Sequence, residues 1–135
     1  MSENTPLENI DWSNKTVLVA EDADDNYFLL TAILKKTKLK LIRANNGQEA
    51  VDICNENKEI DAILMDLSMP VMDGLEATKI IKQSYQDIPI IAQTAYAMEA
   101  DKEKTFKAGC DDYISKPIRR NVLMELLHKY IDNKE

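Results

Sequence analysis

The sequence predicts an α/β fold in which five β-strands alternate with five α-helices around a single sheet. Short apolar runs recur along the chain, and stretches with apolar residues at helical spacing lie between them. Helices that connect successive strands act as crossovers, which require a mostly parallel sheet with helices on both faces. We therefore expect one doubly wound domain, since a chain of 135 residues can bury a core of its own.

The first strand and helix follow an unpatterned polar segment. We interpret residues 1–14 as a tail or linker and expect the folded domain to span residues 15–133, although Trp12 could dock on it. Residues 16–20 form an apolar run that predicts the first strand. Asp24 is expected to cap the helix that follows. The inward face of that helix is formed by Tyr27, Leu30, Ile33 and Leu34.

The second strand is expected at residues 38–41, where lysine and leucine alternate. This pattern is typical of an edge strand with one wet face that is guarded by lysines. Asn46 is predicted to cap the next helix, and Glu49, three residues on, completes a capping box. The inward face of this helix is formed by Gly47, Ala50, Val51 and Cys54.

The remaining three units follow the same pattern. Strands are expected at residues 60–65, from Pro89 onward and at residues 112–115. Helices are expected after a loop that contains Pro70 and Gly74, and over residues 98–107, where Gly109 ends the helix. The last helix is amphipathic, and its apolar face is formed by Leu123, Leu126, Leu127, Tyr130 and Ile131.

The character of the strands indicates their order in the sheet. The first, third and fourth runs are continuously apolar, as central strands are, whereas the second and fifth contain polar residues, as edge strands do. This matches the flavodoxin-like order 2-1-3-4-5, in which ligands bind at the carboxyl ends of the strands, near the switch point between strands one and three.

Composition limits the classes of partner. The chain has 17 Lys and Arg against 24 Asp and Glu, a net charge of -7, which disfavours direct binding to nucleic acid or anionic lipid. Cys54 and Cys110 lack the spacing of a zinc site or a disulfide framework, so we expect buried free thiols. No apolar run is long enough for membrane insertion and no signal peptide is recognisable, so we expect a cytoplasmic protein.

Five polar residues stand at the ends of the predicted strands: Glu21 and Asp22 after the first, Asp66 after the third, Thr94 after the fourth and Lys116 after the fifth. In a parallel sheet, these ends meet at one edge. Carboxylates about 4 Å apart repel by roughly 4 kcal/mol per pair at an effective dielectric near 20, so a cation must balance them. Mg²⁺ prefers such oxygen ligands and keeps positions open for phosphate oxygens.

These residue types predict phosphoryl chemistry on an aspartate. Glu21 and Asp22 would hold the metal, while Asp66 could serve both as a ligand and as the nucleophile that forms an acyl phosphate. The hydroxyl of Thr94 and the ammonium of Lys116 can bind phosphoryl oxygens and neutralise the charge that develops on them.

The motifs resemble those of a known family. The chain has Glu21 and Asp22 with Asn26 after the first strand, Met65-Asp66-Leu67-Ser68-Met69-Pro70 with Met72-Asp73-Gly74 after the third, Thr94-Ala95 after the fourth, and Ala108-Gly109 and Tyr113-Ile114-Ser115-Lys116-Pro117 around the fifth. Over about residues 15–133, this pattern is similar to the receiver domain of response regulators in two-component signalling.

The resemblance implies a function and a role for each motif residue. Asp66 would accept a phosphoryl group from a phosphohistidine of a histidine kinase or histidine phosphotransfer protein, with Mg²⁺ required. Ser68 would lend its backbone carbonyl to the metal, and the backbone N–H groups of Leu67 and Ala95 would contact the phosphate. Thr94 and Tyr113 would form the switch pair, and the peptide bond between Lys116 and Pro117 would be cis.

Two positions distinguish this chain within that pattern. Where the family most often has two aspartates, the chain has Glu21-Asp22, a variant that resembles the receivers of hybrid sensor kinases and favours a phosphorelay. Tyr96, two residues after the switch threonine, is bulky. We hypothesise that it shields the acyl phosphate from water and slows self-hydrolysis.

Other functions are weighed against this one. A degenerate receiver that binds partners without phosphorylation is the main alternative, and the intact Asp66, Thr94 and Lys116 favour the phosphoacceptor. An aspartate-dependent hydrolase is disfavoured because Ser68 stands where a second acid would be needed. A flavin carrier is disfavoured because acids, and not a glycine- and hydroxyl-rich loop, follow the first strand.

Overall fold

The computed structural model describes residues 10–56, 59–95 and 99–132. Its strands are β1 (Thr16–Ala20), β2 (Lys40–Ala44), β3 (Ala62–Asp66), β4 (Ile90–Thr94) and β5 (Asp112–Ser115). Its helices are α1 (Asp24–Leu34), α2 (Gly47–Glu56), α3 (Gly74–Ser84), α4 (Glu99–Ala108) and α5 (Arg120–Leu127). A 3-10 turn, η2 (Lys35–Thr37), follows α1, and a π-helical turn, η3 (His128–Asp132), follows α5. Strands and helices alternate as predicted.

The five strands form one parallel sheet in the order β2-β1-β3-β4-β5, which confirms the predicted order. The pairing of β1 with β3 places Ala20 opposite Met65, so both strands end at the same level of the sheet. β3, which is buried along its whole length, lies at the centre, and the partly exposed β2 and β5 are the edges.

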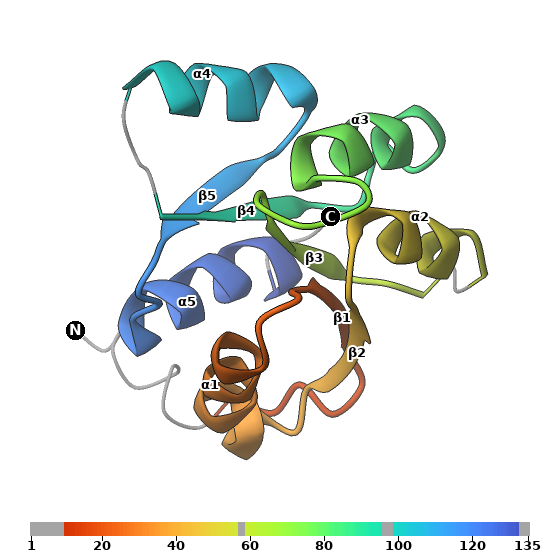
Figure 1. Cartoon of the computed structure of the whole chain (residues 1–135). Helices are drawn as coiled ribbons and strands as arrows, with labels where there is room; N and C mark the ends of the chain where they lie inside the picture. The colour runs from red at the N-terminus through yellow and green to blue at the C-terminus, as the bar shows by residue number, and fades with distance from the viewer. Residues whose placement is uncertain (1–9, 57–58, 96–98, 133–135) are drawn as a thin grey trace.

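Helices cover both faces of the sheet. Figure 1 shows α1 and α5 on one face and α2, α3 and α4 on the other. The two apolar cores follow from the alternation of side chains along the strands. Val19, Leu64 and Ile91 point towards α1 and α5, whereas Met65 and Ala92, from the intervening positions, pack against α2 and α3.

The helix ends agree with the sequence prediction at one site and differ at another. The predicted cap at Asn46 is confirmed, because Asn46 Oδ1 accepts from the N–H of Glu49 at 2.8 Å. Glu49 Oε1 accepts from the N–H of Asn45 at 2.8 Å, one residue before the position that a capping box uses. The predicted cap at Asp24 is wrong. Asp24 is the first residue of α1, and its carboxylate pairs with Arg43 at 2.9 Å instead.

The second strand begins later than predicted. Lys38 has a φ of 64°, a left-handed conformation that ends the η2 turn, so it cannot extend a strand. β2 therefore starts at Lys40 and continues to Ala44, three residues beyond the predicted end at Leu41. The alternation of lysine and leucine identified the edge strand but not its register.

The two cysteines are buried free thiols, as expected. Burial raises the pKa of Cys54 and of Cys110 to about 11, so both remain protonated near neutral pH. No helix in the described part of the chain has the length and the apolar run that crossing a bilayer requires.

Trp12 docks on the domain, as its position allowed. Its side chain is 2% exposed and packs in the core beneath α1 and α5. The indole Nε1–H donates to both carboxylate oxygens of Asp132, at 3.0 Å each. Trp12 therefore ties the segment before β1 to η3 at the far end of the chain.

Truncation of this side chain should destabilise the fold. We expect Trp12→Ala to lower the free energy of unfolding by about 3–5 kcal/mol, the usual range for removing a buried large aromatic side chain. Urea denaturation followed by circular dichroism measures it. Phe28→Ala, at a position 61% exposed on α1, is the control and should change stability by less than about 0.5 kcal/mol. Equal effects of the two substitutions would contradict the packing role of Trp12.

Candidate phosphoacceptor site

Three carboxylates meet at the carboxyl edge of the sheet. Glu21 and Asp22 follow β1, Asp66 is the last residue of β3, and one oxygen of each lies within 4.8 Å of the others. Glu21 is 0% exposed and Asp66 is 3% exposed, while Asp22 faces solvent. The adjacency of β1 and β3 brings these residues together, as the sequence predicted.

Lys116, after β5, supplies a positive charge to this cluster. Its Nζ lies 3.2 Å from Asp66 Oδ2 and 3.4 Å from Glu21 Oε1. Partial burial acts to lower the pKa of Lys116, but the charges of Asp66 and Glu21 outweigh burial, so the pKa is raised overall. Lys116 therefore carries its charge at neutral pH. Its peptide bond to Pro117 is cis, as predicted.

Glu21 is held in place by the start of α1. Its Oε2 accepts from the N–H of Ala23 at 3.1 Å, and its Oε1 accepts from Nδ2 of Asn26 through a short hydrogen bond. Burial is the main cause that raises the pKa of Glu21, and the neighbouring Asp66 adds to it, although the hydrogen bonds from Ala23 and Asn26 oppose both. Hydrogen bonds thus hold the Glu21 carboxylate at a position where burial and the neighbouring Asp66 make its negative charge unfavourable.

The loop after β3 positions Asp66. The N–H of Ser68 donates to Asp66 Oδ1 at 3.1 Å. The N–H of Leu67, which we expected to contact a phosphate, donates instead to the carbonyl of Gln93 at 3.2 Å, because the ladder between β3 and β4 continues by one bond. Of these two N–H groups, only that of Ser68 is directed at the acid here, and the contact of Leu67 with a phosphate stays a prediction.

Gly74 lets α3 begin directly against this loop. A Cβ at this position would lie 2.3 Å from the backbone carbonyl oxygen of Asp66, far closer than any real contact. Its own N–H donates to the carbonyl of Leu67 at 3.3 Å. A side chain here would push α3 and the end of β3 apart, so glycine is required by close approach.

The predicted switch pair lies on the opposite face of the sheet from Asp66. Thr94 ends β4 two residues after Ala92, and Ala92 is directly opposite Tyr113 on β5. The partly buried ring of Tyr113 packs edge-on against Phe106 of α4, with centroids 6.2 Å apart, and Lys102 Nζ lies 5.0 Å from its centroid. Tyr113 therefore links the sheet edge to α4. Ala95 is exposed directly after β4.

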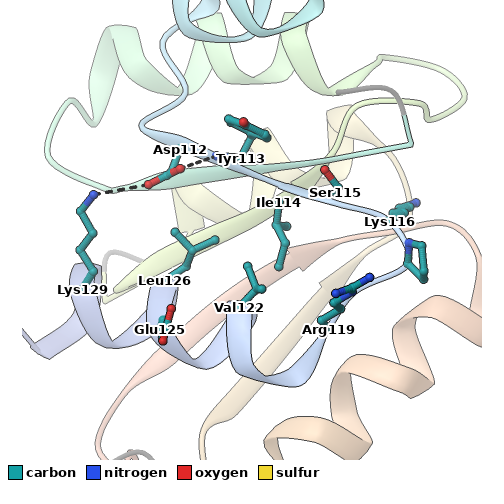
Figure 2. A pocket seen from close by; sticks show the side chains of 11 residues that line it. Asp112, Tyr113, Ile114, Ser115, Lys116, Arg119, Val122, Glu125, Leu126 and Lys129 are labelled. Carbon is teal, nitrogen blue, oxygen red and sulfur yellow. Dashed lines mark hydrogen bonds and ion pairs between the residues drawn. The ribbon is translucent and has the colours of Figure 1, made fainter. Parts of the chain in front are cut away.

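A groove beside β5 reaches the same edge. Figure 2 shows it between β5 and α5. Its volume is about 640 Å³. Tyr113 and Lys116 line it together with residues such as Val122 and Leu126 of α5. Lys129 and Asp112 pair across one end at 3.6 Å. Two residues of the predicted site therefore also line a surface groove of the domain.

Sequence reasoning missed two residues that support Glu21, one directly and one through Asn26. Arg43 of β2 donates from Nε to the backbone carbonyl of Glu21 at 3.0 Å and lies 4.6 Å over the ring of Tyr27. Gln93 of β4 is fully buried and accepts from Asn26 at 3.1 Å. The sequence contained a signal for Gln93, because it is a single amide in an otherwise apolar run. It contained no signal for Arg43, because the atom of Glu21 that Arg43 contacts is a backbone carbonyl oxygen.

The donor set fits a divalent cation. Glu21, Asp22 and Asp66 would carry three negative charges when ionised, and Lys116 offsets one of them. Carboxylate oxygens this close together are the hard ligands that Mg²⁺ takes, and the exposure of Asp22 leaves one side of the cluster open to water and ligand. These residues could therefore hold Mg²⁺ with room for further oxygen ligands.

The raised pKa of Glu21 predicts a pH dependence of stability. The folded state holds the proton of Glu21 more tightly than the unfolded state, so this carboxyl stabilises the fold at low pH. That contribution is lost as pH rises from about its ordinary value of 4.5 through the raised pKa. We expect the stability of the wild type, relative to Glu21→Gln, to fall over this window by up to about 1.4 kcal/mol per pH unit.

Urea denaturation at a series of pH values without divalent cations measures this difference. Glu125→Gln changes the same type of side chain at an exposed position on α5 and is the control. A wild type whose stability keeps a constant difference from that of Glu21→Gln across the window would disprove the expectation.

Comparison with known proteins identifies the family. A family model described as "Response regulator receiver domain" matches residues 17–128. The chain is 39% identical over 119 residues to the polar-differentiation response regulator DivK of Brucella anthropi, covering 87% of this chain and 96% of that protein. It is 42% identical over 128 residues to hybrid signal transduction histidine kinase I of Dictyostelium discoideum, covering 86% of this chain but only 7% of that protein.

Solved structures of receiver domains are also similar to this chain. The receiver domain of the Saccharomyces cerevisiae response regulator Ssk1, crystallised with the histidine phosphotransfer protein Ypd1, has a TM-score of 0.82 and 33% identity, covering 87% of this chain and 89% of that chain. The receiver domain of sensor histidine kinase PA1611 from Pseudomonas aeruginosa was crystallised with magnesium in its active site cleft. It has a TM-score of 0.80 and 35% identity, covering 87% of this chain and 98% of that chain. The chain therefore belongs to the receiver domain family of response regulators, the signalling domains of two-component and phosphorelay systems.

Proposed function

We propose that this receiver domain, over residues 15–133, takes a phosphoryl group from a phosphohistidine onto Asp66 in a Mg²⁺-dependent reaction and then changes conformation to signal. One observation carries the proposal. The buried carboxylate of Asp66 accepts from the N–H of Ser68, contacts the ammonium of Lys116 and lies in one cluster with Glu21 and Asp22. That is the arrangement of a nucleophile, a charge-neutralising group and metal ligands.

The metal ligands in this proposal are the side chains of Glu21, Asp22 and Asp66 and the backbone carbonyl of Ser68. A bound Mg²⁺ would neutralise charge on the phosphoryl oxygens and align them with Asp66. The related receiver of PA1611 was crystallised with magnesium in its active site cleft, which supports this assignment.

The chemical step is a displacement at phosphorus. A carboxylate oxygen of Asp66 forms a bond to phosphorus while the bond from phosphorus to the donor imidazole nitrogen breaks, and the imidazole leaves with the electron pair of that bond. Lys116 would stabilise the negative charge on the transferring group, since its Nζ is already 3.2 Å from Asp66 Oδ2. The hydroxyl of Thr94 and the backbone N–H groups of Leu67 and Ala95 would bind the phosphoryl oxygens. The N–H of Ser68, which donates to Asp66 Oδ1, would hold the acceptor carboxylate in place.

The proposed donor is a histidine kinase or a histidine phosphotransfer protein. The support is that the Ssk1 receiver was crystallised with such a phosphotransfer protein and that a hybrid histidine kinase is among the relatives. The Glu21-Asp22 pair favours the phosphorelay form of this signalling. We propose no direct contact with nucleic acid, because the net charge of -7 would repel its phosphates.

The proposed switch joins the two faces of the sheet. Phosphorylation adds close to two negative charges and strong acceptor oxygens, which would draw the hydroxyl of Thr94 towards the site. Tyr113 would then turn inward and leave its contacts with Phe106 and Lys102. Because Tyr113 and Lys116 also line the groove between β5 and α5, that surface is the proposed readout. Tyr96, proposed to shield the acyl phosphate, lies outside the described residues.

The first test is phosphorylation of an Asp66 variant. We expect Asp66→Asn to abolish incorporation of phosphate from radiolabelled acetyl phosphate with Mg²⁺, because the amide cannot act as the nucleophile. Asp52→Asn, which changes an exposed aspartate on α2, should label like the wild type. Circular dichroism should give the same secondary structure for all three proteins.

The same experiment separates the two candidate functions. Undiminished labelling of Asp66→Asn would place the phosphoacceptor elsewhere and overturn the assignment. A wild type that takes up no phosphate from acetyl phosphate or from a phosphohistidine donor, with or without Mg²⁺, would favour the phosphorylation-independent binding module instead.

A further inference from the structure

Gln93 is a polar residue in the middle of the sheet. It lies on β4, directly between Asp66 of β3 and Ile114 of β5, and is 0% exposed. Since Ile91 and Leu64 pack in the core beneath α1 and α5, the side chains two residues after them, Gln93 and Asp66, point to that same face. An amide thus occupies a buried position in a run of otherwise apolar residues.

The orientation of Gln93 is dictated by the acidic site. The carboxylate of Glu21 can only accept, so Asn26 must present its NH₂ group to it. The same Nδ2 atom lies 3.1 Å from the amide of Gln93, which must therefore present its carbonyl oxygen. Both hydrogens of Asn26 Nδ2 are then used, one by Glu21 and one by Gln93.

This orientation leaves the other end of Gln93 without a partner. Its Nε2 is buried and makes no hydrogen bond to any residue that the structure describes. A buried donor without an acceptor destabilises the fold. The contact between Gln93 and Asn26 is therefore kept at the expense of stability, which is typical of residues that serve a site.

We propose that Gln93 is a positioning residue for the Mg²⁺ site, which acts by fixing Asn26 and, through it, the carboxylate of Glu21. The inference rests on the proposed function, because it assigns Glu21 as a metal ligand. Glu21 has one more side-chain torsion than the aspartate usual at this position, so its carboxylate has more conformations to lose before it can bind. Mg²⁺ tolerates little departure from ideal geometry, so restricting these conformations raises affinity.

A Mg²⁺ titration followed by NMR of backbone amides tests this. Gln93→Leu roughly keeps the size of the side chain but removes the acceptor. We expect its Kd for Mg²⁺ to rise about 3- to 10-fold, below the roughly 10- to 100-fold typical of groups that bond a metal ligand directly, because Gln93 acts through Asn26. Its melting temperature should change little, because removal of the unpartnered Nε2 offsets the loss of the acceptor for Asn26. Weaker metal binding without loss of stability is the result that a packing role would not produce.

A double-mutant cycle identifies the route of the effect. If Gln93 acts through Asn26, then adding Gln93→Leu to Asn26→Ala should change the Kd by less than about 2-fold. Ile91→Val is the matched control, since Ile91 is a fully buried residue on the same strand and face. It should lower the melting temperature and leave the Kd unchanged. Gln93→Met provides a second, unbranched replacement should Gln93→Leu fail to fold.

Each outcome decides the inference. An unchanged Kd in Gln93→Leu or Gln93→Met, or an equal rise in the wild-type and Asn26→Ala backgrounds, would overturn it while leaving the proposed function intact. A wild type that binds no Mg²⁺ would overturn the metal assignment itself and this inference with it.

Discussion

The structure depends on the concentration of negative charge at the end of two neighbouring parallel strands. Glu21 and Asp66 are both buried, and the nearby ammonium of Lys116 offsets only part of their charge. Such a cluster persists because the surrounding fold holds it there: β1 and β3 are paired, Asn26 and Ser68 donate hydrogen bonds, and the core beneath fixes the strands. A cation bound among these oxygens would offset the unfavourable charge at this edge.

The predicted site residues lie on both faces of the sheet. On the side of α1 and α5, Asp66, Gln93 and Asn26 form the acid cluster and its supports. On the side of α3 and α4, Thr94 follows Ala92 by two residues, and Tyr113 packs against Phe106 of α4. Because alternate residues of one strand point to opposite faces, Gln93 and Thr94 link the two sides through a single peptide unit.

Local sequence patterns predicted more of the fold than of the fine geometry. The cap at Asn46 was predicted because its partner, the N–H of Glu49, is only three residues away. The cap at Asp24 was wrong, because the competing partner, Arg43, comes from another strand. The bond from the N–H of Leu67 to the carbonyl of Gln93 was likewise not foreseen, because Gln93 lies on the neighbouring strand. Both features depend on a hydrogen bond or ion pair whose partner is distant in sequence.

The sequence by itself determined the alternation of strands and helices, the order of the sheet, and the identity of the five polar residues at the strand ends, since all of these follow from periodicity and from residue type. Only the tertiary structure decided how those residues are held: which oxygen meets Lys116, why Glu21 has a raised pKa, and why the amide of Gln93 faces Asn26. Those features depend on distances between side chains far apart in the chain, which no local pattern encodes.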